Sequence, residues 1–278
     1  MQLDKKQGII IKIFGDIFIV KSDRLYKLKA KMKFKKSNTK LLVGDRVLFD
    51  ENYILEILPR KNYLIRPPIS NIDQVLLVVS ATNPEFNTNL LDKFLCIIEF
   101  NNVKPIICMS KVDLLNECEY KKITDIMRYY ENIGYQVLYN TDIETIRIIL
   151  KNKITVFSGQ SGVGKSTLLN KINSEFKLKT GDISYKLQRG KNTTRHVELL
   201  EISDGYVADT PGFSSLELLE MNNTDIRDNF IEFSNFNCKY RDCMHINEDD
   251  CGVKNAVKSN EILKSRYDSY KKFINKED

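Results

Sequence analysis

The chain of 278 residues carries a net charge of +6, with 42% hydrophobic and 29% charged residues, as expected for a soluble globular protein of one large or two to three smaller domains. The longest apolar run, residues 75–81, is far too short to span a bilayer, and the first residues lack the apolar core of a secretory signal. We therefore expect a cytoplasmic protein without a membrane partner, whose six cysteines are free thiols or metal ligands rather than disulfides.

The basic charge is concentrated near the N-terminus. Residues 1–70 contain 16 Lys and Arg residues against 7 Asp and Glu residues, whereas the rest of the chain contains 27 against 30. A unit with such an excess of positive charge is expected to bind a polyanion. Several short strand patterns separated by turn residues predict that it folds as a small antiparallel β-barrel of the oligonucleotide-binding (OB) type.

Residues 26–36 alternate strictly between lysines and apolar residues. This period of two predicts one strand with all of its lysines on one face. The lysine face is either a contact for nucleic-acid phosphates or a solvated edge strand that resists aggregation, and we expect the first. The lysines predicted to bind RNA are Lys27, Lys29, Lys31, Lys33 and Lys35.

From residue 71 onward the pattern changes to alternating strands and helices. A near-continuous apolar run over residues 72–82 predicts a strand buried on both faces of a parallel sheet, and an amphipathic helix pattern follows over residues 87–102. Further strands are expected over residues 104–109, 135–139 and 154–157, with helices over residues 119–132 and 142–152. This alternation predicts a doubly wound α/β domain.

The tetrapeptide Ser110-Lys111-Val112-Asp113 directly follows the second predicted strand of this domain. It matches the pattern [NST]-K-x-D, which is weak by itself but lies at the edge of the sheet where such folds bind ligands. The Asp113 carboxylate would accept two hydrogen bonds from the N1–H and the exocyclic amine of guanine. Lys111 would lay its aliphatic stem over the base. We therefore expect Ser110, Lys111 and Asp113 to contact guanine.

A second motif, G-x-x-x-x-G-K-[ST], spans residues 159–166 between a predicted strand and a predicted helix. Backbone N–H groups of such a loop converge on phosphates, and the start of the next helix adds a favourable dipole. Lys165 would contact the β- and γ-phosphates, and the Ser166 hydroxyl would ligate Mg²⁺. The residues expected to bind the triphosphate are Gly159, Gln160, Ser161, Gly162, Val163, Gly164, Lys165, Ser166 and Thr167.

Two later segments are expected to complete the nucleotide site. Asp209 ends a strand pattern and would hold Mg²⁺ through water, while the Gly212 N–H would sense the γ-phosphate. In the preceding polar loop, the Thr193-Thr194 pair offers a hydroxyl that would close over the metal. The expected magnesium ligands are therefore Ser166, Thr194 and Asp209.

Phe213 occupies the place where many GTPases carry the Gln that orients the attacking water. An apolar ring cannot do this, so His196 is the candidate, since a neutral imidazole can accept a proton from water. Alternatively, His196 only begins a strand. The expected catalytic residues are Lys165, Thr194 and His196.

The order of these motifs is unusual, because the base-reading tetrapeptide ordinarily follows the phosphate loop. All strand ends of a parallel sheet converge on one edge, so joining the termini and opening the chain elsewhere preserves the site. The sequence thus predicts a circularly permuted GTPase. One rival interpretation is an ATPase with a fortuitous tetrapeptide; another is an RNA-binding assembly factor whose nucleotide is only a conformational ligand.

Near the C-terminus, three cysteines and a histidine lie within 14 residues: Cys238, Cys243, His245 and Cys251. Three thiolates and one imidazole form the closed shell of a structural Zn²⁺ site, which would couple the folding of a small subdomain to the metal. The last helical pattern, residues 260–277, presents Arg, Lys and Tyr side chains that would either contact RNA or face solvent.

With these three modules, the chain resembles, over essentially its full length, the RsgA (YjeQ) family of GTPases that depend on the small ribosomal subunit. The segments that carry the resemblance are GDRV at residues 44–47, GQSGVGKSTLLN at 159–170, DTPGF at 209–213 and RYDSY at 266–270. The resemblance implies GTP hydrolysis to GDP, stimulated by the small subunit and its rRNA, in late subunit maturation. We expect a monomer with domains over residues 1–70, 71–220 and 221–278.

The chain also departs from the family pattern. Ser110 replaces the usual Asn or Thr, and the second base-reading loop, which would fall at residues 139–142, is not recognisable. The switch segment at residues 190–196 keeps its final histidine but lacks the third threonine of the family. We match Thr194 to the metal-ligating position, with Thr193 as the alternative.

Overall fold

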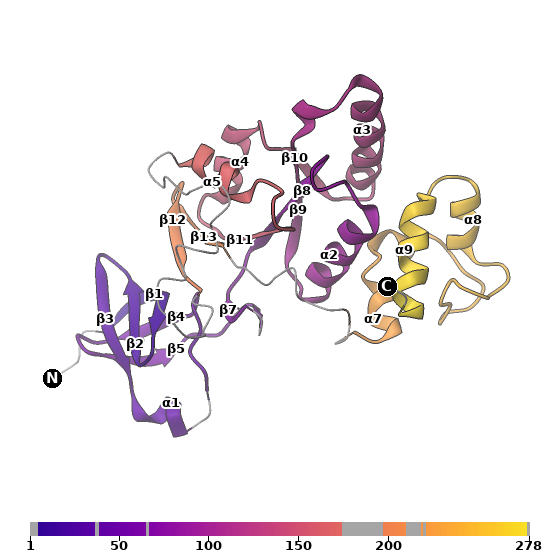
Figure 1. Cartoon of the computed structure of the whole chain (residues 1–278). Helices are drawn as coiled ribbons and strands as arrows, with labels where there is room; N and C mark the ends of the chain where they lie inside the picture. Colours follow the sequence, from indigo (N-terminus) through magenta and orange to yellow (C-terminus); the bar gives the residue numbers. More distant parts are fainter. Residues whose placement is uncertain are drawn as a thin grey trace.

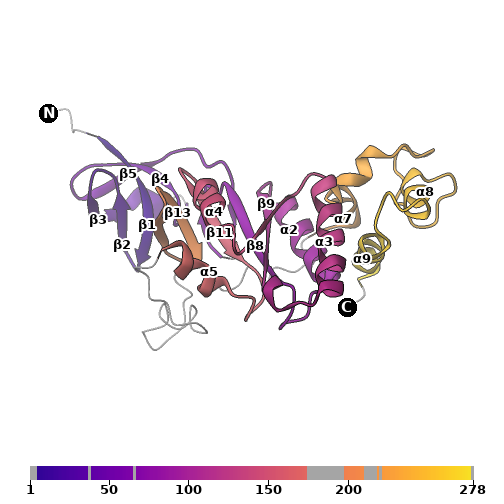
Figure 2. The same ribbon diagram turned by 90° about the horizontal axis from the view of Figure 1, so that it is seen from above.

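A computed structural model describes residues 5–36, 39–64, 67–173, 197–209, 218 and 221–276. In these parts of the chain, three units lie in a row: a barrel near the N-terminus, a central sheet flanked by helices, and a helical unit near the C-terminus (Figures 1 and 2). Among the described residues, no helix has the length and apolar character that crossing a membrane requires.

Five strands form the closed barrel, in the order β1-β2-β3-β5-β4: β1 (Lys6–Phe14), β2 (Ile17–Lys21), β3 (Leu25–Ala30), β4 (Arg46–Phe49) and β5 (Tyr53–Ile57). Alternate residues of these strands point inward, where Ile10, Val20, Val47 and Ile54 are fully buried. The predicted OB-type barrel is confirmed.

The prediction of one strand over residues 26–36 is wrong beyond Ala30. The chain instead leaves the barrel wall and forms the short helix α1 (Met32–Lys36). The reason is the register of the sheet: β2 begins at Ile17, which pairs with Lys29, so β2 offers no partner to residues beyond this point. Alternation in the sequence predicts which faces are apolar, but a strand also requires a neighbour to bond with.

A short connection fixes the barrel to the central sheet. It contains the hairpin of β6 (Tyr63–Leu64) and β7 (Ile69–Ser70). Asp45, which is fully buried, accepts hydrogen bonds from the Arg60 guanidinium at 2.7 and 2.8 Å and from the Ser70 hydroxyl at 2.7 Å. A carboxylate satisfied in this way holds the connection against the barrel.

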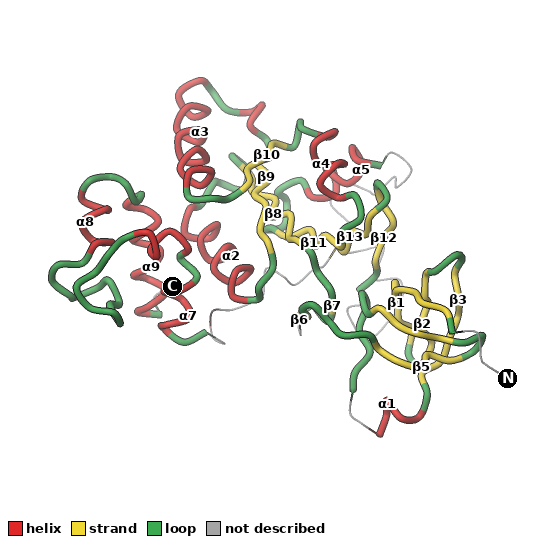
Figure 3. The backbone as a smooth tube through the Cα atoms, turned by 180° about the vertical axis from the view of Figure 1, so that it is seen from behind, coloured by secondary structure: helices red, strands yellow, loops and turns green. Residues whose placement is uncertain are grey.

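The central sheet has six strands in the order β10-β9-β8-β11-β13-β12, of which β12 alone is antiparallel to its neighbour. They are β8 (Gln74–Ser80), β9 (Lys104–Ser110), β10 (Gln136–Tyr139), β11 (Ile154–Ser158), β12 (Leu199–Ile202) and β13 (Gly205–Asp209). In Figure 3, β12 lies beside β1 of the barrel. The strands predicted from the sequence are confirmed to within about two residues at each end.

Helices cover both faces of this sheet. The helices α2 (Thr88–Phe100) and α3 (Glu117–Asn132) pack on one face, and α4 (Ile143–Leu150) and α5 (Lys165–Ile172) pack on the other. Successive residues of β8 accordingly enter different cores, Val75 and Leu77 under α2 and Leu76 and Val78 under α4 and α5. The doubly wound α/β domain is therefore confirmed.

The C-terminal unit consists of α7 (Asn223–Asp228), the 3-10 helix η5 (Ile231–Asn235), α8 (Gly252–Lys258) and α9 (Lys264–Asn275). Arg266 on α9 is completely buried, so the prediction that this arginine faces solvent or RNA is wrong. Its guanidinium pairs with Asp92 of α2 at 2.8 Å and with Glu232 of η5 at 2.8 Å. It also lies 4.2 Å from the centre of the Phe230 ring. The last helix is thus tied to the central domain by a buried ion-pair network.

Candidate functional site

The phosphate loop connects β11 to α5 at the carboxyl edge of the sheet. Gly159 has a φ of 132°, and a Cβ atom there would lie 2.1 Å from the Val78 carbonyl oxygen, so only glycine fits. Gly164, with a φ of 95°, is the N-cap of α5. Ser166 and Thr167 follow in the first turn of this helix. The backbone therefore has the strand–loop–helix arrangement that the motif requires.

The Lys165 ammonium group folds back over this loop. It donates hydrogen bonds to the carbonyl oxygens of Gly159 at 2.7 Å and Gln160 at 2.6 Å. A flexible cation held beside the loop is suited to meet the β- and γ-phosphates of a nucleotide.

The base-reading tetrapeptide and the phosphate loop meet in space. Lys111 donates a hydrogen bond to the Gly162 carbonyl at 2.8 Å and another to the Asn83 carbonyl. The buried Ser110 hydroxyl donates to the Val163 carbonyl at 2.6 Å. This side chain, expected to contact the base, thus bonds to the phosphate loop, a role that no local pattern reveals because the partners are 53 residues apart.

Asp113 lies in the 3-10 helix η1 (Val112–Leu114), directly after β9, and its side chain is exposed. The loop after β10, where the sequence showed no recognisable motif, lies beside the end of β9. In this loop Asn140 donates its backbone N–H to the Met109 carbonyl at 2.8 Å, and Asp142 accepts the Tyr139 N–H at 2.8 Å. This loop therefore lies beside the end of β9 at the carboxyl edge of the sheet.

Asp209 ends β13, the strand adjacent to β11, and pairs in register with Phe157, two residues before Gly159. Its backbone therefore lies next to the phosphate loop, as predicted. The Asp209 side chain lies outside the described residues, as do Thr193, Thr194, His196, Gly212 and Phe213 in full.

A second site gathers the four predicted metal ligands of the C-terminal unit. The candidate ligand atoms of Cys238, Cys243, His245 and Cys251 all lie within 4.8 Å of one another. The sulfur atoms of Cys238 and Cys251 are 3.8 Å apart, and His245 Nδ1 lies 3.5 and 3.3 Å from them. Tetrahedral Zn²⁺ with Zn–S bonds of about 2.3 Å requires sulfur atoms about 3.8 Å apart, so these residues fit the ion.

Surrounding side chains hold this cluster in place. Tyr267 of α9 donates its hydroxyl to the His245 carbonyl at 2.6 Å, and Glu248 accepts the backbone N–H groups of Met244 and Ile246 at 2.6 and 2.9 Å. Burial lowers the pKa of His245, which favours the neutral imidazole that binds metals. The cluster is thus built to hold a metal ion.

The lysines predicted to bind RNA are divided among three elements. Lys27 and Lys29 are exposed on β3, Lys31 lies in the connection after it, and Lys33 is exposed on α1. Lys35 is also on α1, but its side chain lies outside the described residues.

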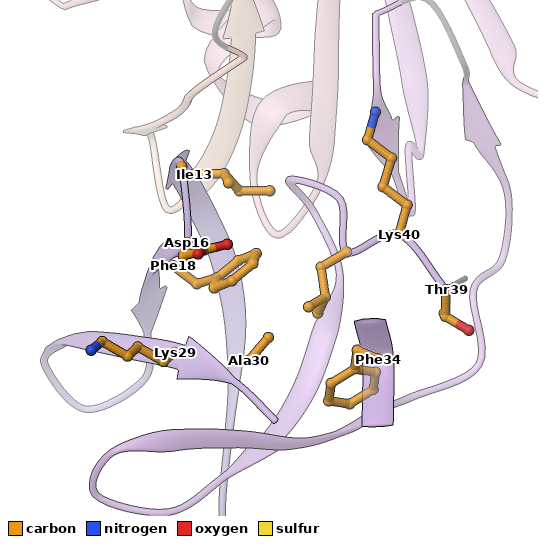
Figure 4. A pocket seen from close by; sticks show the side chains of 10 residues that line it. Ile13, Asp16, Phe18, Lys29, Ala30, Phe34, Thr39 and Lys40 are labelled. Carbon is orange, nitrogen blue, oxygen red and sulfur yellow. The ribbon is translucent and has the colours of Figure 1, made fainter. Parts of the chain in front are cut away.

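A cavity of about 460 Å³ opens on the barrel, where Lys29 of β3 and Phe34 of α1 form part of its wall. It is lined by Phe18 of β2 and Phe34 of α1, with Lys29 and Lys40 also in its wall (Figure 4). Apolar and aromatic side chains among lysines are the surface that single-stranded nucleic acids favour.

The chain also matches sequence models of known protein families. The sequence model of the RsgA GTPase family matches residues 57–219, and that of the RsgA N-terminal domain matches residues 7–53. A protein named small ribosomal subunit biogenesis GTPase RsgA 2, from Listeria monocytogenes, is 48% identical over 275 residues, covering 95% of this chain and 94% of its own length. The protein named small ribosomal subunit biogenesis GTPase RsgA from Enterococcus faecalis is 43% identical over 279 residues, 96% of this chain and 94% of its own.

Two crystal structures share the fold over almost the whole chain. YjeQ from Thermotoga maritima superposes with a TM-score of 0.87 at 34% identity and covers 98% of both chains. YloQ, described as a circularly permuted GTPase, superposes with a TM-score of 0.84 at 38% identity and covers 98% of this chain and 94% of its own.

Proposed function

This chain belongs to the RsgA GTPase family, and we propose on this basis that it hydrolyses GTP in the cytoplasm and acts, as a monomer, in late maturation of the small ribosomal subunit. The observation that carries the proposal is the contact between the base-reading tetrapeptide and the phosphate loop, where Lys111 reaches the Gly162 carbonyl at 2.8 Å. A guanine reader and a triphosphate cradle at one edge of a sheet form a GTP site, whatever the order of the motifs along the chain.

Within this proposal, each part of the site has one task. Asp113 reads the guanine base, and Lys165 neutralises charge on the transferred phosphoryl group. Ser166, Thr194 and Asp209 would hold the Mg²⁺ that accompanies GTP, and this ion would supply further charge neutralisation. His196 positions the attacking water, since Phe213 cannot. The Gly212 N–H responds to the γ-phosphate.

The direct test is the rate of GTP hydrolysis with and without purified small ribosomal subunits, repeated with ATP as competitor. We expect multiple turnovers, a rate that rises when subunits are added, and little inhibition by excess ATP, because an adenine ring lacks the donors that Asp113 accepts. A rate of GTP hydrolysis that is the same with and without subunits would contradict the role in maturation. If ATP competed as well as unlabelled GTP does, the assignment of guanine as the recognised base would be contradicted.

The Ser166→Ala variant is expected to lose about a hundredfold in the rate of GTP hydrolysis, because a preorganised contact to the metal–phosphate group is removed. The fold should be unchanged, as checked by circular dichroism. Thr124→Ala is the matched control, since that hydroxyl bonds to the Tyr120 carbonyl in α3, outside the phosphate loop. Full turnover by the Ser166 variant would contradict this assignment of the phosphate site.

We propose that Zn²⁺ is the metal of the C-terminal cluster and that it is structural. Elemental analysis should find one zinc per chain, and a strong chelator should lower the melting temperature of the C-terminal unit, because the ion links the residues that bind it in the folded state only. Cys251→Ser should lose most of the zinc, whereas Cys118→Ser, which alters an exposed cysteine outside the cluster, should keep it. A zinc-free protein that melts unchanged would contradict the proposal.

We also propose that the barrel provides the contact with rRNA of the small subunit. The exposed Lys27, Lys29, Lys31 and Lys33 support this, since phosphate contacts from lysines require accessible ammonium groups rather than one continuous strand. Lys35 is included among the proposed RNA contacts because it belongs to the same alternating pattern in the sequence. Such contacts would bind RNA without reading its sequence.

A further inference from the structure

The barrel and the central sheet share strand β1. Strand β4 pairs with β1 over residues 6–9, and beyond this stretch Lys12 forms an isolated antiparallel bridge with Glu198, which directly precedes β12. The β1–β2 ladder shifts register between Ile10 and Lys12, at the same point. A bulge of this kind bends a strand and re-aims its residues. Beyond this point β1 still pairs with β2 of the barrel, and Lys12 also reaches the edge of the central sheet.

Side chains reinforce this junction, which we call the β1–β12 seam and define as Lys12 and Glu198. Lys12 Nζ lies 2.5 Å from a Glu198 oxygen, with the two side chains 26% and 21% exposed. Lys21 lies 3.0 Å from Glu201, but that glutamate is 57% exposed. The Lys12–Glu198 pair is therefore the better shielded of the two and the only one that accompanies a backbone bridge among the described residues.

The flanking residues of β1 divide between two cores. Ile10 is fully buried inside the barrel, Ile9 and Ile11 pack against the core of the central sheet, and Ile13 packs against both cores. Val197 and Leu199, on either side of Glu198, belong to that same core. Because β1 is wedged between the two cores, a displacement of the barrel would be transmitted to the start of β12 rather than absorbed by a flexible linker.

The start of β12 lies at the nucleotide edge of the sheet. Leu199 pairs with Ala208, so Glu198 and Asp209 stand at the same end of the β12–β13 ladder. In the sequence, Glu198 comes two residues after His196 and four after Thr194. On the barrel side, the Lys12 ammonium lies 4.7 Å from the ring centre of Phe14, which is 46% exposed at the β1–β2 turn. The seam thus connects an exposed end of the barrel with the chain that leaves the proposed catalytic segment.

We infer that Lys12 and Glu198 are positioning residues through which contact of the barrel with the small subunit accelerates GTP hydrolysis. The inference rests on the proposed function. When the barrel is held on rRNA, the bridge and the ion pair hold the start of β12 at the nucleotide edge of the sheet, beside the end of β13. Apolar packing holds the two units together, and the ion pair sets the register of the bridge, since a slip by one residue would turn Glu198 toward the core.

Charge reversal tests this inference in the full-length protein. Lys12→Glu and Glu198→Lys should each leave the basal rate of GTP hydrolysis nearly unchanged, because neither residue touches the nucleotide. Each should lower the stimulation by saturating small subunits about tenfold, the size of a typical coupling between sites. The double reversal Lys12→Glu/Glu198→Lys should restore the stimulation, because the pair is rebuilt with opposite polarity.

Hydrogen–deuterium exchange supplies a second measurement that does not depend on turnover. Adding small subunits should slow exchange of residues 197–202 in the wild type and in the double reversal, but not in either single reversal. The reversal Lys21→Glu is the matched control: it changes the same charge on the neighbouring strand, yet it leaves the bridge in place and should keep the stimulation.

The outcomes separate the inference from the proposed function. Single reversals that are stimulated like the wild type, with the same slowing of exchange, would overturn the role of the seam while leaving the function intact. A double reversal that fails to recover would also overturn it, because loss of the Lys12 charge alone would then explain the defect. If small subunits changed neither the rate of GTP hydrolysis nor the hydrogen–deuterium exchange of the wild type, both proposals would be overturned.

Discussion

Replacing Asp113 with Asn is expected to lower the affinity for GTP about a thousandfold and to raise the affinity for xanthosine triphosphate. In the proposed site, the carboxylate would accept hydrogen bonds from both the N1–H and the exocyclic amine of guanine. In the variant, the amide NH₂ group would face that amine, leaving two donors opposed in the site. Xanthine carries an oxygen in place of the amine, so it would match the Asn side chain.

The measurement is the dissociation constant of each nucleotide, taken by competition with a fluorescent analogue. Glu117→Gln is a suitable control, since it removes an exposed carboxylate from the first turn of α3, a few residues further along the chain. If the Asp113 variant bound GTP as well as the wild type does, Asp113 would not read the base. The tetrapeptide would then not belong to a permuted GTP site, although the assignment of the phosphate loop would be unaffected.

The second large effect is expected in the buried network of the C-terminal unit. Arg266→Ala should destabilise that unit by about 3–5 kcal/mol, because it leaves the carboxylates of Asp92 and Glu232 buried without their cation. In the wild type, burial disfavours the charged guanidinium, but the two carboxylates outweigh this and hold the pKa of Arg266 well above its usual value. Urea unfolding, followed by tyrosine fluorescence of this unit, measures the change.

The loss of stability caused by Arg266→Ala should depend on pH. Burial already raises the pKa of Asp92, and removing Arg266 takes away the opposing positive charge, so this pKa should rise further. A carboxyl whose pKa is higher in the folded than in the unfolded state contributes stability at low pH and loses it as the pH rises through the folded-state value. The variant should therefore lose more stability relative to the wild type at pH 8 than at pH 5.

Lys271→Ala provides the comparison on the same helix. Lys271 pairs with Asp268 at 2.8 Å, but both side chains are more than 40% exposed, so its loss should change the stability by about 0.5 kcal/mol or less. An Arg266 variant as mildly affected as this control, at both pH values, would show that the buried network does not secure the last helix.

Local patterns in the sequence predicted much of the fold, and the reason lies in their range. The apolar run of β8 and the caps and periodicity of α2 and α3 depend on neighbours a few residues away. The phosphate loop and the Cys/His cluster are similarly short, so their spacing alone restricts the geometry. The alternation over residues 26–36 gave a wrong prediction because a strand also depends on a distant partner. Strand β2 supplies no partner beyond Lys29.

The sequence by itself determined the chemistry available to this protein: a phosphate loop, a carboxylate suited to guanine, a Cys₃His metal cluster and a basic barrel. Only the tertiary structure decided which of these groups meet. The contacts between Lys111 and Gly162, between Arg266 and Asp92, and between Lys12 and Glu198 join residues far apart in the chain. Each depends on the order of strands in a sheet or on the packing of one unit against another. Local sequence patterns do not specify such contacts between residues that are distant in the chain.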